Sequence, residues 1–279
     1  MQAGGFKTLK KCGIYLFMLV MVLVWMAPIY TLIATAIKAK RDFYNNVGLF
    51  GIPPVIAWSN FSNAITKGRL LLYMRNDLVV CCLKVPLGIF VEALAAFAMT
   101  RLNIRHKTGI FIFFIVGMML PIQVALVPIN VIYSRLKLIN TYWGLFYAYV
   151  GFGISYGILI LRGFFRTIPT DIDDAGRIDG CGKWRLFWNI ILPIAKPAIA
   201  TLVIMDFLAT WNEYILALII INDNGKKTVP VGLMTFVQEH STDFGYLCAG
   251  VLISVLPVLL VYLIFQRYFV EGVAGAVKQ

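Results

Sequence analysis

Apolar runs alternate with shorter polar stretches along the whole chain. The apolar runs cover residues 12–37, 71–99, 108–134, 141–161, 198–221 and 244–266. A transmembrane helix needs about 20 predominantly apolar residues, so each run is long enough to cross a bilayer. The pattern therefore predicts an all-α polytopic membrane protein with six transmembrane helices.

The first run follows a short basic segment, residues 1–11, and together they resemble a signal peptide. The run is longer than the 7–15 apolar residues typical of such a signal, so we interpret it as a retained first span. Residues 12–279 then form one membrane domain. The third run contains Pro121 and Pro128 and the sixth Pro257, and we expect these prolines to kink the helices.

Composition agrees with this interpretation. The chain has 279 residues, of which 60% are hydrophobic and 14% charged, whereas soluble domains carry about 25% charged residues. The net charge of +12 does not indicate nucleic acid binding, because basic residues of membrane proteins collect in short cytoplasmic loops. The five cysteines show no metal or disulfide spacing, and the sequence has neither a phosphate-binding loop nor a catalytic set. We expect no enzyme, no catalytic residue and no metal site.

The distribution of basic residues predicts the orientation. With six spans, the side that holds both termini carries fourteen Lys and Arg residues and the other side ten. The difference in the number of Lys and Arg residues is clearest in the short loops. Residues 101–107 and 162–196, on the side of the termini, hold many more of them than residues 135–137 on the other side. The positive-inside rule then places both termini, including residues 1–11, and the segment 167–197 in the cytoplasm.

Segment 167–197 is a polar interruption between two apolar runs, and it has helix signals of its own. Thr170 is expected to cap a helix whose first turn holds Asp171, Asp173 and Asp174, and Gly180 with Gly182 is expected to end it. A second amphipathic run follows, with Trp184, Phe187, Trp188 and Ile191 at helical spacing. The segment is predicted to be a helical projection that docks on a partner.

The spacing within this segment resembles the EAA loop of permease subunits of bacterial ABC importers. That pattern is Glu-Ala-Ala, three residues, Gly, nine residues, Ile-x-Leu-Pro. The matching residues are Asp174, Ala175, Gly176, Gly180, Ile190, Leu192 and Pro193, and Asp179 lies within the motif. Asp174 replaces the usual Glu and Gly176 the usual Ala. The resemblance implies that these residues couple to a separate ATP-binding subunit as a coupling helix.

Further stretches resemble the smaller membrane subunit of maltose-type carbohydrate importers. They are 120–123 with 127–128, 138–141, Trp211-Asn212-Glu213-Tyr214, and the tail at 266–270 and 275–278. The resemblance implies a type I ABC importer permease in a bacterial inner or plasma membrane, surrounded by lipid, with a sugar or oligosaccharide as cargo. Implied partners are a second permease subunit, an ATP-binding subunit dimer and an extracytoplasmic solute-binding protein. ATP and Mg belong to the ATPase subunits, and this chain binds no cofactor.

Carboxylates inside the apolar runs are candidates for the solute pathway. Asp206, Thr210 and Glu213 share one helix face, and a charge facing lipid costs about 2.5–3.5 kcal/mol. Asp206, Asn212, Glu213 and Tyr214 are therefore expected either to line the pathway or, for the carboxylates, to pair with Lys84 or Arg75. Lys84 is otherwise expected to extend outward to the membrane surface, and Glu92 to make a packing or interface hydrogen bond.

Two alternatives stay open at this point. The cargo of an ABC importer could be a polyol, glycerol phosphate, an amino acid or a peptide instead of a sugar. In a different class of protein, Asp206 and Glu213 would be proton or ion sites of a secondary transporter.

Overall fold

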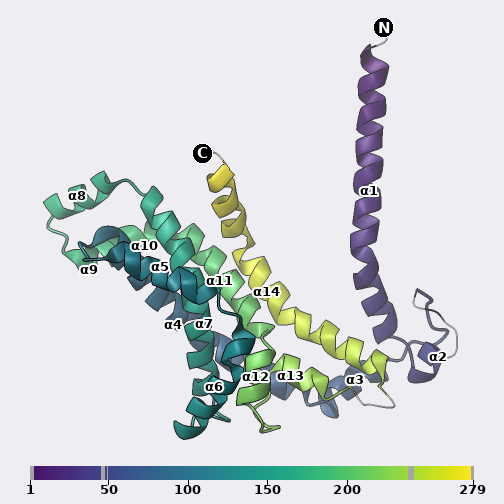
Figure 1. Ribbon diagram of the computed structural model, residues 1–279. Helices are drawn as coiled ribbons and strands as arrows, with labels where there is room; N and C mark the ends of the chain where they lie inside the picture. Colours follow the sequence, from purple (N-terminus) through teal and green to yellow (C-terminus); the bar gives the residue numbers. More distant parts are fainter. Residues whose placement is uncertain (1–2, 45–47, 49, 238–241, 278–279) are drawn as a thin grey trace. The chain divides into compact units, whose positions relative to one another are not determined.

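The structure is a computed structural model that describes residues 3–44, 48, 50–237 and 242–277, with the side chains of residues 11–43, 48, 50–237 and 242–267. Every regular element in the described part is helical, which confirms the all-α prediction (Figure 1). The helices are α1 Ala3–Ala36, α2 Lys40–Tyr44, α3 Ser59–Thr66, α4 Leu70–Arg101, α5 Lys107–Met118, α6 Ile122–Arg135, α7 Tyr142–Thr167, α8 Thr170–Ile178, α9 Lys183–Leu186, the π-helix Phe187–Ile191, α10 Leu192–Ile194, α11 Lys196–Trp211, α12 Ile215–Ile220, α13 Val229–Met234 and α14 Phe244–Val277.

Four of the described helical segments are long and apolar enough to cross a membrane. They are Lys11–Ala36, Leu70–Arg101, Tyr142–Thr167 and Phe244–Arg267. Two bent helix pairs raise the number to six if each pair is one span: Lys107–Met118 with Ile122–Arg135, and Lys183–Ile194 with Lys196–Trp211. The protein is thus an all-α, multi-pass membrane protein, with four to six candidate spans in the part described.

The run 108–134 differs from the single kinked helix expected there. It forms α5 and α6, whose axes are bent by 96°. Pro121 stands before α6 in an extended conformation, with φ −62° and ψ 130°. Proline lacks the amide hydrogen that a continuous helix requires, so the break falls where the sequence placed a kink, but it is far sharper. Pro128 lies inside α6 without ending it.

The run 198–221 is also interrupted. α11 ends at Trp211, and α12 begins only at Ile215. Asn212 to Tyr214 therefore form a non-helical connection within an apolar run. Irregular backbone at membrane depth is tolerated only where it is buried in protein or lines a cavity. This connection is for that reason a place to look for a site.

The chain divides into two compact units, residues 1–70 with 233–255 and residues 71–232 with 256–279. In the first unit, α3 corresponds to the short amphipathic piece expected in the loop 38–70. Its buried Asn60 donates hydrogen bonds to the carbonyl oxygens of Ala36 (2.8 Å) and Lys38 (2.7 Å). The bond to Ala36 satisfies a carbonyl in the last turn of α1, which the helix itself leaves without a partner. The bond to Lys38 holds the chain just beyond the helix.

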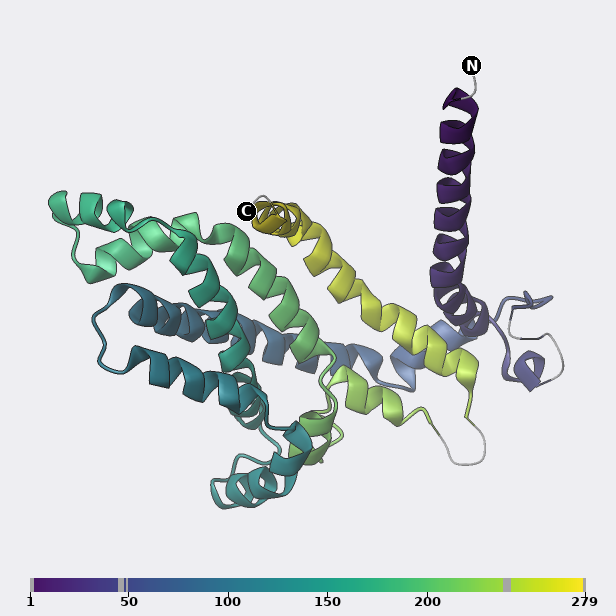
Figure 2. The same cartoon turned by 45° about the horizontal axis from the view of Figure 1, so that its top comes forward.

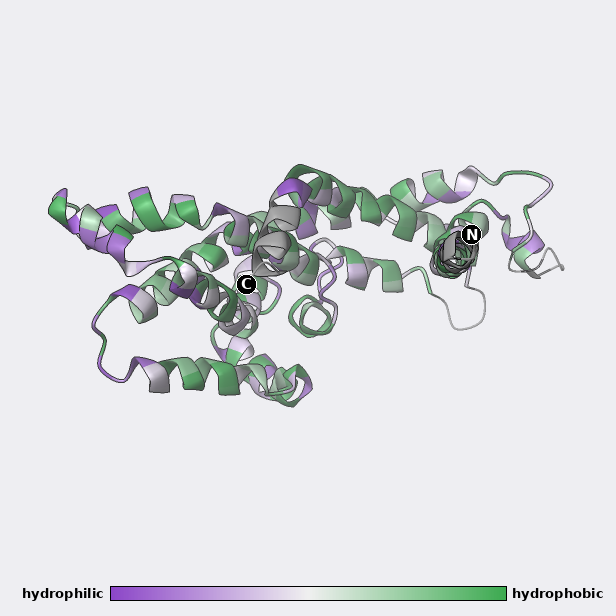
Figure 3. Cartoon of the chain, turned by 90° about the horizontal axis from the view of Figure 1, so that it is seen from above, coloured by the Kyte–Doolittle hydropathy of each residue, from purple (hydrophilic) through white to green (hydrophobic). Residues whose placement is uncertain are grey.

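The second unit is built around a buried cluster in which α4, α7, α12 and α13 meet. Val80, Leu145, Leu216, Ile220 and Val231 are among its members, each at most 3% exposed. α6 and α12 lie at one end of this unit, and α8 and α9 lie at the opposite end (Figures 1 and 2). Hydropathy colouring shows mainly hydrophobic long helices, with hydrophilic residues gathered around α8 (Figure 3). Two places in this unit are therefore candidates for a functional site: the interruption between α11 and α12, and the polar segment around α8.

Candidate functional site

The segment 167–197 contains a short helix, α8, whose start differs from the sequence prediction. Thr170 was expected to cap it, and this is wrong. Pro169 occupies the N-cap position, Thr170 is the first helical residue, and no side chain caps the helix. Proline has no side-chain acceptor, so the first-turn amides of α8 receive no side-chain cap, while the ring of Pro169 fixes φ at the residue that precedes the helix. Asp171 and Asp173 lie in the first turn, as expected.

The end of α8 confirms the role expected for Gly180. Its φ of +77° is a left-handed conformation that favours glycine. The amide of Gly180 donates to the carbonyl of Arg177 (3.0 Å), and that of Cys181 donates to the carbonyl of Gly176 (2.8 Å). Both bonds together form a Schellman motif, which ends a helix and reverses the chain.

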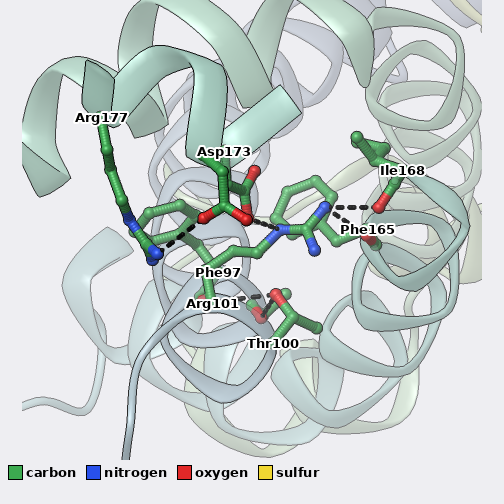
Figure 4. A network of polar contacts seen from close by, with 9 residues as sticks. Phe97, Thr100, Arg101, Phe165, Ile168, Asp173 and Arg177 are labelled. Atoms are coloured by element: carbon green, nitrogen blue, oxygen red, sulfur yellow. Dashed lines mark hydrogen bonds and ion pairs between the residues drawn. The ribbon is translucent and has the colours of Figure 1, made fainter. Parts of the chain in front are cut away.

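A buried ion pair anchors α8 to the end of α4 (Figure 4). The Nε atom of Arg101 lies 3.1 Å from Oδ2 of Asp173, and each side chain is 5% exposed. Arg101 also donates through its second terminal nitrogen to the carbonyls of Phe165 (3.1 Å) and Ile168 (2.8 Å) at the end of α7. One guanidinium thus joins α4, α7 and α8.

Sequence reasoning missed this joint. Arg101 counted only as a loop cation and Asp173 only as a first-turn acid, because nothing in the sequence relates two residues so far apart. Burial raises the pKa of the Asp173 carboxyl above its ordinary value, and Arg101 and Arg177 oppose that rise. Burial therefore makes the folded protein bind the proton of the Asp173 carboxyl more tightly than the unfolded chain does. This effect lowers the free energy of unfolding as pH rises above the ordinary pKa of a carboxyl group. Arg101 offsets part of that cost.

The outer face of α8 is exposed to solvent. Asp174, Ala175, Arg177, Ile178 and Asp179 are all exposed, and Ile178 is 86% exposed. Asp174 accepts a hydrogen bond from Arg177 at 3.0 Å, a surface pair that contributes little to stability. Single exposed apolar residues are common on protein surfaces, so it is the exposure of the whole face that leaves α8 accessible to a partner.

The inner face of α8 explains a departure from the EAA pattern. Gly176 is buried, and a Cβ there would lie 2.8 Å from Cδ1 of Ile190. Glycine in place of alanine therefore lets the two arms of the segment, α8 as the first and residues 183–191 as the second, approach closely. Leu192 is half-buried, and Pro193 is exposed, at the connection to α11.

The second arm packs on α4 through aromatic rings. Phe187 is fully buried, and its ring lies 5.2 Å from that of Phe97. The ring of Trp188 stacks on Phe90 at 5.8 Å. The arm is thus fixed to a membrane-length helix, whereas α8 projects from it.

The second candidate site is a pocket of about 250 Å³ beside the interruption between α11 and α12. Its lining is mostly apolar and aromatic with a few polar groups, namely Lys84, Ile122, Tyr149, Phe152, Gly153, Tyr156, Met205, Asp206, Ala209, Thr210, Glu213 and Leu216. Such a combination is typical of ligand pockets. Of the four pathway candidates, Asp206 and Glu213 line it.

Asp206 forms an ion pair with Lys84, one of the two partners that the sequence left open. Its Oδ2 atom lies 2.6 Å from Nζ of Lys84, and the two side chains are 6% and 3% exposed. The prediction that Lys84 extends outward to the membrane surface is therefore wrong. Lys84 is close enough to neutralise Asp206, which an apolar environment favours more than separate charges.

Glu213 holds the start of α12. Its Oε1 accepts from the amide of Leu216 (2.8 Å), and its Oε2 accepts from the amide of Ala217 (3.0 Å). These amides have no partner within the helix, so the carboxylate makes the interruption possible. Asn212 is exposed and donates to the carbonyl of Leu208 (2.9 Å), and Tyr214 packs against the buried cluster of this unit. The structure thus separates Asn212 and Tyr214 from the pocket.

Glu92 shows a further close contact that the sequence did not reveal. It is fully buried against Gly157 of α7, where a Cβ would collide with its carboxyl group. We expect Gly157→Ala to destabilise the protein by about 1–3 kcal/mol, since added volume in a packed interior forces strain. Gly151→Ala is the matched control, because a Cβ there meets nothing within 4 Å. Equal melting temperatures of both variants would contradict this contact.

The resemblance of the C-terminal tail receives no structural support, because the side chains of residues 268–277 and all of residues 278–279 lie outside the described part.

Comparison with solved structures supports the fold. A chain of a bacterial ABC transporter involved in the import of the acidic polysaccharide alginate matches with a TM-score of 0.80 at 20% identity, covering 94% of this chain and 97% of that one. A chain of the bacterial alginate ABC transporter in complex with an alginate pentasaccharide-bound periplasmic protein matches with a TM-score of 0.68 at 12% identity, covering 94% and 96%. At these identities the likeness shows the fold alone.

Sequence comparison establishes the family. The probable starch degradation products transport system permease protein AmyC of Thermoanaerobacterium thermosulfurigenes is 30% identical, with 94% of both chains covered. The probable ABC transporter permease protein YurM of Bacillus subtilis is 32% identical over 96% of this chain and 89% of its own. The maltodextrin transport system permease protein MdxG of Bacillus subtilis is 29% identical over the full length of both.

The family described as binding-protein-dependent transport system inner membrane component matches residues 84–274, a range that contains both candidate sites. The resemblance to ABC importer permeases is thereby confirmed, and the chain belongs to the family of inner membrane components of binding-protein-dependent transport systems.

Proposed function

We propose that this chain is one of two permease subunits of an ATP-driven importer of a sugar or oligosaccharide and forms half of the translocation pathway. Relatives named for starch degradation products and maltodextrin support this cargo class. The pocket beside Glu213 supports it as well, because carboxylates and aromatic rings suit sugar hydroxyls and sugar faces. The other partners are an ATP-binding subunit dimer, which holds ATP and Mg, and an extracytoplasmic solute-binding protein.

The observation that carries the proposal is the exposed face of α8 on a buried anchor. A surface that transmits force must be free to meet its partner and rigidly attached behind it. Asp174 to Gly180 are exposed apart from Gly176, while Arg101 and Asp173 tie the same helix to α4 and α7. α8 is thus the coupling helix and enters a cleft of the ATPase subunit.

Six spans, with both termini and residues 167–197 in the cytoplasm, complete the arrangement. When ATP closes the ATPase dimer, the coupling helices of the two permease subunits move together. Ile190 to Pro193 pass this motion to α11, the helix whose Asp206 lines the pocket. The pathway then opens outward. Hydrolysis reverses the motion. Asn212 and Tyr214 remain pathway candidates through their position in the interruption.

We expect Asp174→Lys and Gly180→Pro each to abolish ATP-driven uptake of a labelled oligosaccharide without preventing membrane insertion. The first reverses a charge on the exposed face, and the second replaces a left-handed glycine by a residue restricted to φ near −65°. Asp171→Lys is the matched control, an exposed acid of the same helix outside the EAA pattern. Uptake in proteoliposomes with the partner subunits is the measurement.

Uptake that survives ATP depletion and follows a proton gradient would reject the importer in favour of an ion-coupled transporter. Wild-type uptake by both variants would reject the coupling role of α8. Ligand binding by the solute-binding protein from a neighbouring reading frame then identifies the cargo, and a polyol, glycerol phosphate or amino acid there would correct the cargo class alone.

A further inference from the structure

Two cavities meet beside the coupling segment, one apolar and one basic. The apolar cavity has a volume of about 320 Å³ and is lined by Leu94, Phe97, Ala98, Leu102, Lys183, Trp184 and Phe187. The basic cavity has a volume of about 370 Å³ and is lined by Arg101, Leu102, Asn103, Arg177, Cys181, Gly182, Lys183 and Leu186. Leu102 and Lys183 belong to both. No Asp or Glu is among these lining residues.

We propose that this double cavity binds an anionic phospholipid, with the phosphate beside Lys183 in the basic cavity and an acyl chain in the apolar one. The ligand must carry a negative group next to an apolar chain, because one cavity is basic, the other is apolar, and the two meet at Leu102 and Lys183. Phosphatidylglycerol has this chemistry.

Lys183 is the cation that remains for the headgroup. Arg101 is paired with Asp173 and Arg177 with Asp174, whereas the ion pairs seen among the described residues leave Lys183 out. A lysine near the membrane surface contributes about 1 kcal/mol to the attraction of anionic lipid. The polar wall of the headgroup site is completed by Asn103.

The place of the cavities favours a lipid over a protein partner. Leu94, Phe97 and Ala98 lie on one face in the last turns of α4, a helix of membrane-spanning length that ends at Arg101. Trp184 lines the apolar cavity and is 65% exposed, as is typical of the interfacial aromatic belt. An acyl chain reaches the apolar cavity directly from the bilayer, whereas a soluble subunit would have to enter the bilayer to fill that cavity.

The site also borders the anchor of the coupling helix, because Arg101 lines the basic cavity and holds Asp173. A lipid there contacts α4 through Leu94 and Phe97 and residues 183–191 through Lys183, and so adds a second tie between them. Anionic lipid is thus expected to stiffen the joint that carries force. This consequence rests on the proposed coupling role, whereas the lipid site does not.

The test is lipid retention by the purified transporter complex, measured by native mass spectrometry after incubation with equal amounts of phosphatidylglycerol and phosphatidylcholine. The wild type should retain phosphatidylglycerol preferentially. Lys183→Gln should reduce that retention about fivefold, and Ala98→Leu, which fills the apolar cavity, should reduce it as well. Lys196→Gln is the control, since this exposed lysine of the same segment lines neither cavity. Melting temperatures in phosphatidylcholine establish that all variants are folded.

Three results would overturn the proposal. The first is equal phosphatidylglycerol retention by the wild type, Lys183→Gln and Ala98→Leu. The second is binding of glycerol phosphate as tight as that of phosphatidylglycerol, which would show a site for soluble anions. The third is retention only after the ATPase subunits are removed, which would show that a protein partner covers this face. None of these outcomes bears on whether the complex imports a sugar.

Discussion

Replacing Arg101 with alanine is expected to lower ATP-driven uptake by at least about tenfold and to lower the melting temperature. The substitution leaves Asp173 buried without its cation, and removing one partner of a buried pair costs about 3–5 kcal/mol. It also removes the donors to the carbonyls of Phe165 and Ile168. α8 then loses its attachment to α4 and α7, so under the proposed function motion of the ATPase no longer reaches the spans.

The controls separate loss of the joint from loss of charge. Arg105→Ala removes an exposed cation from the loop that follows α4 and should leave both uptake and melting temperature unchanged. Arg101→Met combined with Asp173→Leu removes both charges, and it should recover much of the stability without restoring full uptake, because the carbonyl contacts are still missing. An Arg101→Ala protein with wild-type uptake and melting temperature would rule out the joint as part of the coupling path.

The second large effect is expected at the intramembrane pair of Lys84 and Asp206. Lys84→Met leaves a carboxylate that is 6% exposed without a cation, and we expect the melting temperature to fall by the equivalent of about 3–5 kcal/mol. Asp206→Leu should act similarly by leaving the ammonium group alone. Cys82→Ala, an exposed position on the same helix, is the neutral comparison.

The double variant Lys84→Met with Asp206→Leu distinguishes the two roles of this pair. With no unpaired charge left, its melting temperature should return close to that of the wild type. Under the proposed solute pathway its uptake should remain low, because the pocket has lost both of these polar groups. Wild-type uptake by the folded double variant would show that the pair is structural only.

Several features could be predicted from local patterns in the sequence. Apolar runs of membrane length predicted an all-α membrane protein, since transfer of apolar side chains and satisfaction of backbone hydrogen bonds depend on short stretches of chain. Gly180 was predicted to end α8 because a left-handed turn after a helix favours glycine. The spacing from Asp174 to Pro193 indicated the permease family, because all residues of this motif lie within one segment of the sequence.

Boundaries and interruptions were less accessible. Pro121 indicated a kink but not a bend of 96°, since the angle depends on what each half-helix packs against. The break at Asn212 to Tyr214 was invisible in an apolar run, because it depends on Glu213 turning its carboxylate to the amides of Leu216 and Ala217. The wrong cap at Thr170 follows from placing the helix start by residue type alone, whereas the backbone turns helical one residue earlier than expected, directly after Pro169.

Partners of buried charges were decided by tertiary structure alone. From the sequence, Asp206 had Lys84 and Arg75 as alternatives, and only the packing of α4 against α11 brings Lys84 to 2.6 Å. Arg101 and Asp173 are adjacent only because α8 folds back onto the ends of α4 and α7. Local composition determined which segments are long and apolar enough to cross a membrane and which segment between them is polar. Pairing between distant residues required the fold, because electrostatic attraction at low dielectric depends on separation in space and not on separation along the chain.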